Sequence, residues 1–196
     1  MADAPSSHAA RRRRRVALVL AALLLGPPLS VAGWAGLLRL TGNVHEFEPG
    51  IYRSGQFGAG RLSSFLAEHG IATVINLRGA NPGRSWYDAE AEAVRRAGAA
   101  YLSVPLSANH EPDAATLAAL VRDLEGAKAP LLIHCEAGAD RSGLAAALYE
   151  RLVLHRSPEV AAGQLSFRYG HFPWLISRSG AMDRTFAKVV GKGIPD

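Results

Sequence analysis

The chain has 196 residues, 48% of them hydrophobic and 20% charged, and a formal net charge of +5. This length gives one globular domain of ordinary size with its own core. The positive charge belongs to the start of the chain, because from Thr41 onward 16 Lys and Arg stand against 16 Asp and Glu. The later part is formally neutral, which excludes a basic stripe for nucleic acid, and no nucleic-acid partner is expected.

The first 38 residues have the composition of a targeting or anchoring segment. Residues 1–15 are small and polar and end in five arginines, which predicts a basic disordered tail. Residues 16–38 contain no charged side chain and are long enough to span a bilayer as a single transmembrane helix. The run Gly26-Pro27-Pro28 predicts a kink or a break in that helix.

Two interpretations of this segment remain open. It is either an uncleaved signal anchor or a signal peptide cleaved near Ser30-Val31-Ala32. The apolar run continues past that site, which favours the anchor. Arginines before the span favour an N-terminus inside the cell. With the N-terminus inside, residues 39–196 are expected to be extracytoplasmic. An Ala- and Arg-rich composition is typical of bacteria with G+C-rich genomes, and in a bacterium that location is the periplasm.

Residues 39–196 alternate between strand-like and helix-like segments. Strands are predicted at 43–47, 51–53, 72–77, 100–106 and 131–134. Helices are predicted at 61–69, 86–97, 113–124 and 142–155, from 157 onward, and within 172–190. This alternation predicts an α/β fold with a central, mostly parallel sheet flanked by helices. Such a fold places its functional site at the carboxyl ends of the strands.

The single cysteine lies in the run His134-Cys135-Glu136-Ala137-Gly138-Ala139-Asp140-Arg141-Ser142, between a predicted buried strand and a predicted helix. A thiolate is a nucleophile, and a helix N-terminus with a nearby cation can lower a cysteine pKa from about 8.5 to roughly 3.5–7.5. Backbone N–H groups of such a loop can bind the oxygens of a phosphoryl group, and Arg141 can bind two of them. The run therefore predicts attack on a phosphate ester.

The same run resembles the HC-x5-R-[S/T] signature of the cysteine-dependent protein tyrosine and dual-specificity phosphatase superfamily. Residues 50–56 (GIYRSGQ) and 74–78 (VINLR) resemble segments of its small bacterial and plant or fungal-type dual-specificity members, and the resemblance covers about residues 44–170. It implies a phosphatase that hydrolyses phosphomonoesters through a phosphocysteine intermediate, with no metal or other cofactor. The implied substrates are phosphotyrosine, phosphoserine or phosphothreonine in protein, or a phosphorylated lipid.

The resemblance also implies roles for the residues of the run. Cys135 would be the nucleophile and Arg141 the clamp on the phosphate oxygens. Ser142 would assist departure of the thiolate in the second step, and His134 would have a structural role in ordering the loop. The loop backbone that would bind substrate comprises Glu136, Ala137, Gly138, Ala139, Asp140 and Arg141.

The proton donor departs from the family pattern. The superfamily usually supplies an aspartate from the loop after the strand that ends near residue 105. Here that position falls near Ala108 or Asn109, and neither side chain is an acid. The remaining candidates are Glu111 and, as the alternative, Asp140, followed by Asp113, which is better explained as a helix N-cap, and His110.

Two further functions remain as alternatives. A rhodanese-like sulfurtransferase also places a cysteine on a loop before a helix. Its loop is typically one residue shorter than the five residues between Cys135 and Arg141, which argues against it. A non-catalytic phosphate-binding module would explain the missing aspartate, but the presence of both Cys135 and Arg141 argues for catalysis.

Overall fold

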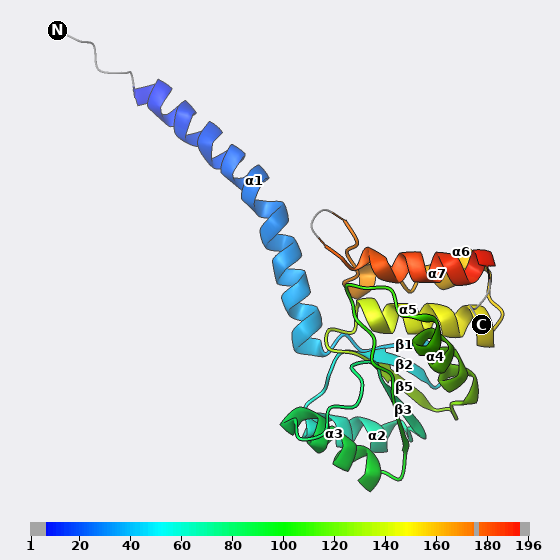
Figure 1. Ribbon diagram of the computed structural model, residues 1–196. Helices are drawn as coiled ribbons and strands as arrows, with labels where there is room; N and C mark the ends of the chain where they lie inside the picture. Colours follow the sequence, from blue (N-terminus) through cyan, green and yellow to red (C-terminus); the bar gives the residue numbers. More distant parts are fainter. Residues whose placement is uncertain (1–6, 175–176, 193–196) are drawn as a thin grey trace. The chain divides into compact units, whose positions relative to one another are not determined.

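The computed structural model describes residues 7–174 and 177–192. The chain divides into two units, Met1–Leu38 and Arg39–Asp196. The second unit contains a five-stranded, mostly parallel sheet with helices on both faces (Figure 1), so the predicted α/β class is confirmed.

The N-terminal helix α1 spans Ser7–Thr41 without interruption. Residues 7–15 are helical, so the disordered tail predicted for residues 1–15 is wrong for the described residues. The unbroken helix also excludes a break at Gly26-Pro27-Pro28, whereas the kink predicted there stays a prediction. Arginine is a good helix former, so the helix extends through the basic run once the apolar segment has nucleated it. Prolines are tolerated inside apolar spanning helices. Helix residues Ala10–Thr41 contain an 18-residue window with a mean hydropathy of 2.1, so this helix is long and apolar enough to cross a membrane.

The sheet has the strand order β1-β2-β5-β3-β4, with β1 antiparallel to β2 and the other pairs parallel. The strands are β1 His45–Glu48, β2 Ile51–Ser54, β3 Thr73–Asn76, β4 Ala100–Ser103 and β5 Leu131–His134. The register aligns Ser54 and Asn76 with His134 at the carboxyl end of the central strand. Cys135 therefore leaves the middle of the sheet at the edge where α/β folds bind ligands.

Most predicted boundaries agree with the structure to within two or three residues. The helices are α2 Ala59–Glu68, α3 Ser85–Arg96, α4 Ala114–Gly126, α5 Asp140–Leu148, α6 Pro158–Ala162 and α7 Gly180–Lys192, with a π-helical turn η1 Tyr149–Val153 and a 3₁₀ turn η2 Phe167–Tyr169. Strand β4 ends three residues before the predicted Leu106. Pro105 has no N–H to donate to a sheet ladder, which explains the early end.

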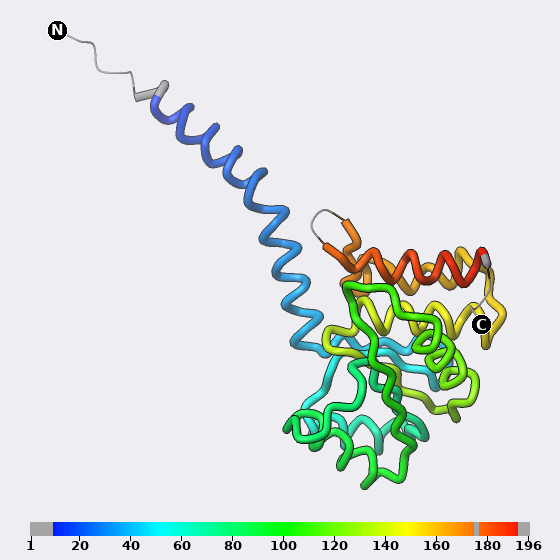
Figure 2. Tube along the Cα trace, in the orientation of Figure 1, coloured from blue at the N-terminus to red at the C-terminus, as the bar shows by residue number. Residues whose placement is uncertain are grey.

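Alternate side chains of the strands build a separate core on each face of the sheet. Val74 and Leu132 pack with α2 and α3, whereas Ile75, Leu131 and Ile133 pack with α4, α5 and α7. Figure 2 shows, along the Cα trace, the helices that lie on the two sides of the sheet. The central strand is thus buried on both faces, which gives the loop after it a rigid base.

Candidate active site

Strand β5 leads directly into the loop at residues 135–139, and α5 begins at Asp140. The predicted helix start at Ser142 is therefore two residues late. An acidic residue is favoured in the first turn of a helix, where it interacts with the positive end of the helix dipole. As a result Asp140 and Arg141 both belong to the first turn of α5.

Four consecutive carbonyl groups of the loop accept hydrogen bonds from outside it. Gln56 N donates to Glu136 O at 3.1 Å, and Asn43 Nδ2 donates to Ala137 O at 3.0 Å. Arg53 Nη2 donates to the next two carbonyls, at 3.0 and 2.9 Å; these belong to Gly138 and Ala139. The carbonyls are thus held toward the protein.

This arrangement fixes the direction of the loop N–H groups. In a trans peptide the C=O of one residue and the N–H of the next point in opposite directions. Because the carbonyls of residues 136–139 point into the protein, the N–H groups of residues 137–140 point to the opposite side. Several convergent N–H groups at the start of a helix form an anion-binding site.

Gly138 permits the tight approach between this loop and the end of β2. Its φ is +73°, and a Cβ placed there would lie 2.6 Å from Gly55 N and 2.8 Å from the carbonyl carbon of Ser54. Both the backbone conformation and the backbone contacts therefore require glycine at this position.

Arg53 is the buried residue that organises the loop. Its side chain is fully buried, and Nη1 donates to Gln164 O at 2.7 Å and to Gln164 Oε1 at 2.8 Å. The guanidinium also lies 4.2 Å from the centre of the Tyr169 ring. Burial lowers the pKa of Arg53 to about 10, with the charges of Cys135 and Tyr169 opposing that shift, so the group stays cationic at neutral pH.

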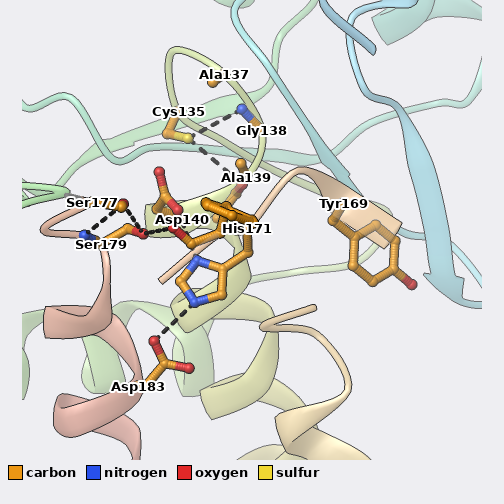
Figure 3. Close-up of polar contacts among 12 residues, drawn as sticks. Cys135, Ala137, Gly138, Ala139, Asp140, Tyr169, His171, Ser177, Ser179 and Asp183 are labelled. Atoms are coloured by element: carbon orange, nitrogen blue, oxygen red, sulfur yellow. Dashed lines mark hydrogen bonds and ion pairs between the residues drawn. The ribbon is translucent and has the colours of Figure 1, made fainter. Parts of the chain in front are cut away.

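The structure brings Cys135, Ser142 and the N–H of Gly138 together. Cys135 Sγ lies 3.6 Å from Ser142 Oγ. It also lies 3.3 Å from Gly138 N (Figure 3). Cys135 is buried, with 1% relative exposure. The Cys135 thiol donates to Ser142 Oγ and accepts from Gly138 N, and once the thiol is ionised the hydroxyl can donate to the sulfur in its turn.

Arg141 lies beside the same loop with part of its donor capacity unused. Its Nη1 donates to Leu106 O at 3.4 Å, and its Nη2 is 3.9 Å from Glu136 Oε2. The buried Nε has no hydrogen-bond partner in the described part of the chain. Arg78 Nη2 is also 3.9 Å from Glu136 Oε2, so two guanidinium groups meet one acidic group at the edge of the loop.

His134 packs beneath the loop against Glu90. Both side chains are 3% exposed, and His134 Nε2 is 2.7 Å from Glu90 Oε1, although neither ring nitrogen is aligned for a good hydrogen bond. Burial favours a higher pKa for Glu90, but its contacts with His134, Tyr101 and Gln56 outweigh that effect and lower the pKa. The pair lies inside the fold, between α3 and β5, as a structural contact would.

The two carboxylates of the β4–α4 connection face other parts of the protein. Glu111 Oε1 accepts from Arg184 Nε at 2.8 Å and Oε2 contacts Lys188 Nζ, both on α7. These hydrogen bonds, that of Lys188 first, lower the pKa of Glu111 and keep it ionised. Asp113 accepts from Thr116 N at 2.7 Å as the N-cap of α4.

Asp140, the alternative acid, contacts a histidine instead. His171 Nδ1 is 2.7 Å from Asp140 Oδ1, and His171 Nε2 is 2.8 Å from Asp183 Oδ2 (Figure 3). Within residues 7–174 and 177–192, no group of three or more His, Cys, Asp or Glu side chains is arranged to hold a metal ion.

Sequence reasoning missed the supports of the loop rather than its reacting groups. The sequence pattern assigns neither Arg53 nor His171 a role in supporting the loop. The one available signal was the resemblance of residues 50–56, which contain both Arg53 and Gln56. Nothing in the sequence alone indicates that Asn43, Gln164 or His171 lies near the loop.

The comparisons with known proteins agree with this geometry. Residues 61–168 match the family model described as Swiss Army Knife protein, DSP-PTPase phosphatase domain. The chain is 32% identical over 151 residues to the dual specificity protein phosphatase TpbA of Pseudomonas aeruginosa, covering 72% of this chain and 65% of that protein. The chain thus spans just under two thirds of the length of this curated relative.

Solved structures show the same fold. The crystal structure of P. aeruginosa TpbA in complex with pTyr has a TM-score of 0.56 and 22% identity, covering 77% of this chain and 92% of that one. The core catalytic domain of the PP-IP phosphatase SIW14 from S. cerevisiae has a TM-score of 0.53 and 20% identity, covering 72% and 83%. This chain belongs to the DSP-PTPase phosphatase family, within the cysteine-dependent superfamily that its loop resembles.

Proposed function

We propose that the protein is a phosphatase that hydrolyses phosphomonoesters through a phosphocysteine intermediate. One observation carries this proposal: four successive carbonyls in the loop after Cys135 are hydrogen-bonded to the surrounding protein. The N–H groups of these peptides therefore point to the opposite side, where they can bind a phosphoryl group. Membership of the DSP-PTPase family supports it.

In the first step, the Cys135 thiolate attacks phosphorus, forming the S–P bond as the bond to the leaving oxygen breaks. Arg141 and the loop N–H groups bind the equatorial oxygens, where charge redistributes in the transition state. In the second step, water attacks phosphorus and the S–P bond breaks. Ser142 Oγ, 3.6 Å from the sulfur, then donates a hydrogen bond to the departing thiolate.

The proton donor to the leaving group is the weakest part of this site. Glu111 is held ionised by Arg184 and Lys188, and Asp140 Oδ1 is engaged by His171. We infer that the enzyme favours esters whose leaving group departs with little protonation. Aryl phosphates fit this requirement better than alkyl phosphates, because the pKa of tyrosine is only about 10. The relative solved with pTyr supports phosphotyrosine as the first substrate class to test.

The direct test is a phosphatase assay of the full chain in detergent with a phosphotyrosine peptide, with and without EDTA. We expect turnover that EDTA does not change, and a loss on the order of 10⁴-fold or more in Cys135→Ser. Activity retained by Cys135→Ser would rule out the proposal. Tight phosphopeptide binding without turnover by the unmodified chain would favour a non-catalytic module, and thiosulfate:cyanide transfer would favour the sulfurtransferase.

We further propose that α1 anchors the protein in the membrane, with the phosphatase domain outside the cytoplasm and its site close to the lipid surface. Asn43, whose side chain donates to the loop carbonyl of Ala137, follows the apolar run by only five residues. Five residues span at most about 18 Å even when extended. A phosphorylated protein or lipid at the membrane surface would therefore be within reach.

Mass spectrometry of the mature N-terminus and protease digestion of spheroplasts test this placement. An intact N-terminus and a domain digested in spheroplasts without lysis are expected. Cleavage near Ser30-Val31-Ala32 would show that the segment is a signal peptide, and protection of the domain until lysis would contradict the orientation.

A further inference from the structure

A buried histidine connects the phosphate-binding loop to helix α7. His171 is completely buried, and its two ring nitrogens lie 2.7 Å from Asp140 Oδ1 and 2.8 Å from Asp183 Oδ2. Asp140 is the loop residue directly before Arg141, and Asp183 lies in the first turn of α7. Figure 3 shows the ring of His171 between Asp183 and the segment that carries Asp140.

The geometry defines the protonation state of this cluster. Ionised carboxylates only accept hydrogen bonds, so a ring that faces one at each nitrogen must carry a proton on both. Burial favours a lower pKa for His171, but the bonds to Asp140 and Asp183 and their charges outweigh burial and raise the pKa above its usual value. The two carboxylate contacts and the raised pKa both favour the imidazolium form of His171.

An imidazolium at this position reduces the electrostatic repulsion between Asp140 and a bound phosphate. Asp140 places a negative charge in a loop that must bind a phosphate dianion next to a thiolate. The cations adjacent to the two carboxylates in sequence are directed elsewhere: Arg141 to Leu106 O and Glu136, and Arg184 to Glu111. In the described part of the chain, the charged groups that contact His171 are Asp140 from α5 and Asp183 from α7.

We propose that His171 is a positioning residue of the phosphatase reaction: its positive charge, shared by Asp140 and Asp183, offsets part of the negative charge of Asp140 and keeps the loop able to bind a dianionic phosphate. The proposal rests on the function proposed above and adds that the protonation state of His171 governs how tightly the loop binds phosphate. When pH rises and His171 loses a proton, one ring nitrogen faces a carboxylate without a hydrogen, and the charge of Asp140 is no longer balanced. Dianion binding then weakens.

The test measures binding of tungstate, a phosphate-like oxyanion, at high dilution to the full chain in detergent from about pH 6 to pH 9, the range in which a histidine with a raised pKa titrates. The parent protein carries Cys135→Ser, which removes the titration of the thiol. We expect its Kd to rise with pH as His171 deprotonates. Adding His171→Asn, which retains a donor toward Asp140 but no charge, is expected to weaken binding roughly 10-fold or more at low pH and to flatten the pH dependence.

Adding Asp140→Asn to that protein supplies the decisive comparison. Removing the charge that His171 balances is expected to restore tight, pH-independent binding, which a merely structural role for His171 would not predict. Failure of this restoration, or an unchanged Kd profile in His171→Asn, would overturn the proposal. His155→Asn, at an exposed histidine, is the matched control and is expected to bind as the parent does.

A second variant decides the matter if His171→Asn does not fold. Asp183→Asn leaves His171 with one carboxylate, so the midpoint of the pH dependence is expected to move to lower pH. An unmoved midpoint would contradict the proposal. Because tungstate binding needs no turnover, an inactive wild-type chain would refute the proposed phosphatase function while leaving this result readable.

Discussion

The two connections that leave the sheet after β5 and after β4 are built in different ways. The loop after β5 is held at four consecutive carbonyls by donors from the protein around it, including the buried Arg53. The connection from β4 to α4 is largely exposed, and Glu111 attaches it to α7 through surface ion pairs. The loop that we propose binds phosphate is thus held by the fold itself, whereas no comparably held proton donor is present among the residues that the structure describes.

This difference has an energetic basis. Breaking a buried, hydrogen-bonded charge leaves several polar groups without partners, and costs far more than breaking a solvated ion pair. Gln164 extends the buried side further, since its Nε2 donates to Glu150 Oε1 at 2.6 Å. Burial, the leading effect, raises the pKa of Glu150, so this network holds its groups in a dry environment.

The largest effect is expected from Arg53→Met, which removes the buried hydrogen bonds that hold the loop after β5. Four acceptor contacts would be lost, so we expect the free energy of unfolding to fall by about 3 kcal/mol. Because the loop carbonyls would be free to turn, kcat/KM for an aryl phosphate is expected to fall on the order of 100-fold. Denaturant unfolding and steady-state kinetics of the full chain measure the two effects.

The matched control is Arg53→Lys, which keeps the charge but cannot bind two carbonyls and Gln164 at once. Its activity is expected to lie between those of the wild type and Arg53→Met. Wild-type activity in Arg53→Met would mean that the loop keeps its shape without this support.

The same contrast explains what the sequence could predict. The loop sequence at Cys135, strand β5 and the N-cap Asp113 are each recognisable from residues within a few positions, and local patterns predicted them. The bond from Arg53 to Gly138 joins residues 85 apart, and that from His171 to Asp140 joins residues 31 apart. No periodicity or spacing reports such contacts, which arise only when the sheet register is fixed.

Errors at the N-terminus have a different origin. Local rules treat Pro27 and Pro28 as helix breakers, because they assume that water competes for the freed backbone groups. The apolar residues on both sides continue the helix instead. At the active site, the family resemblance predicted roles for Cys135, Arg141 and Ser142. It could not predict that Arg184 and Lys188 of α7 bind Glu111.

Changing the leaving group is expected to alter kcat/KM by about as much as Arg53→Met does, but without any change in stability. If no carboxylic acid donates a proton, a phosphotyrosine peptide should be hydrolysed at least ~100-fold faster in kcat/KM than the same peptide with phosphoserine. The aryl oxygen leaves with less need of a proton. Equal rates would show that a proton donor operates, and the ratio in Asp140→Asn would then test the loop carboxylate.

The smallest effect is expected from Glu111→Gln, which removes the surface ion pairs that attach the β4–α4 connection to α7. Because Lys188 and Arg184 lower the pKa of Glu111 in the folded protein, the ionised carboxylate stabilises the fold above its unfolded pKa, and this contribution is lost as pH falls through the folded value. Thermal unfolding of Glu111→Gln and of the wild type should therefore differ slightly at neutral pH, and the difference should vanish in acid and shrink in high salt.

Kinetics of the same variant separate a surface ion pair from a proton donor. We expect Glu111→Gln to hydrolyse phosphotyrosine and phosphoserine peptides with the wild-type ratio, as should Glu125→Gln, an exposed control on α4. A selective loss on the phosphoserine peptide in Glu111→Gln alone would identify Glu111 as the acid. The β4–α4 connection would then have to release α7 during the reaction, because a carboxylate held by two cations cannot carry the proton that an alkyl leaving group needs.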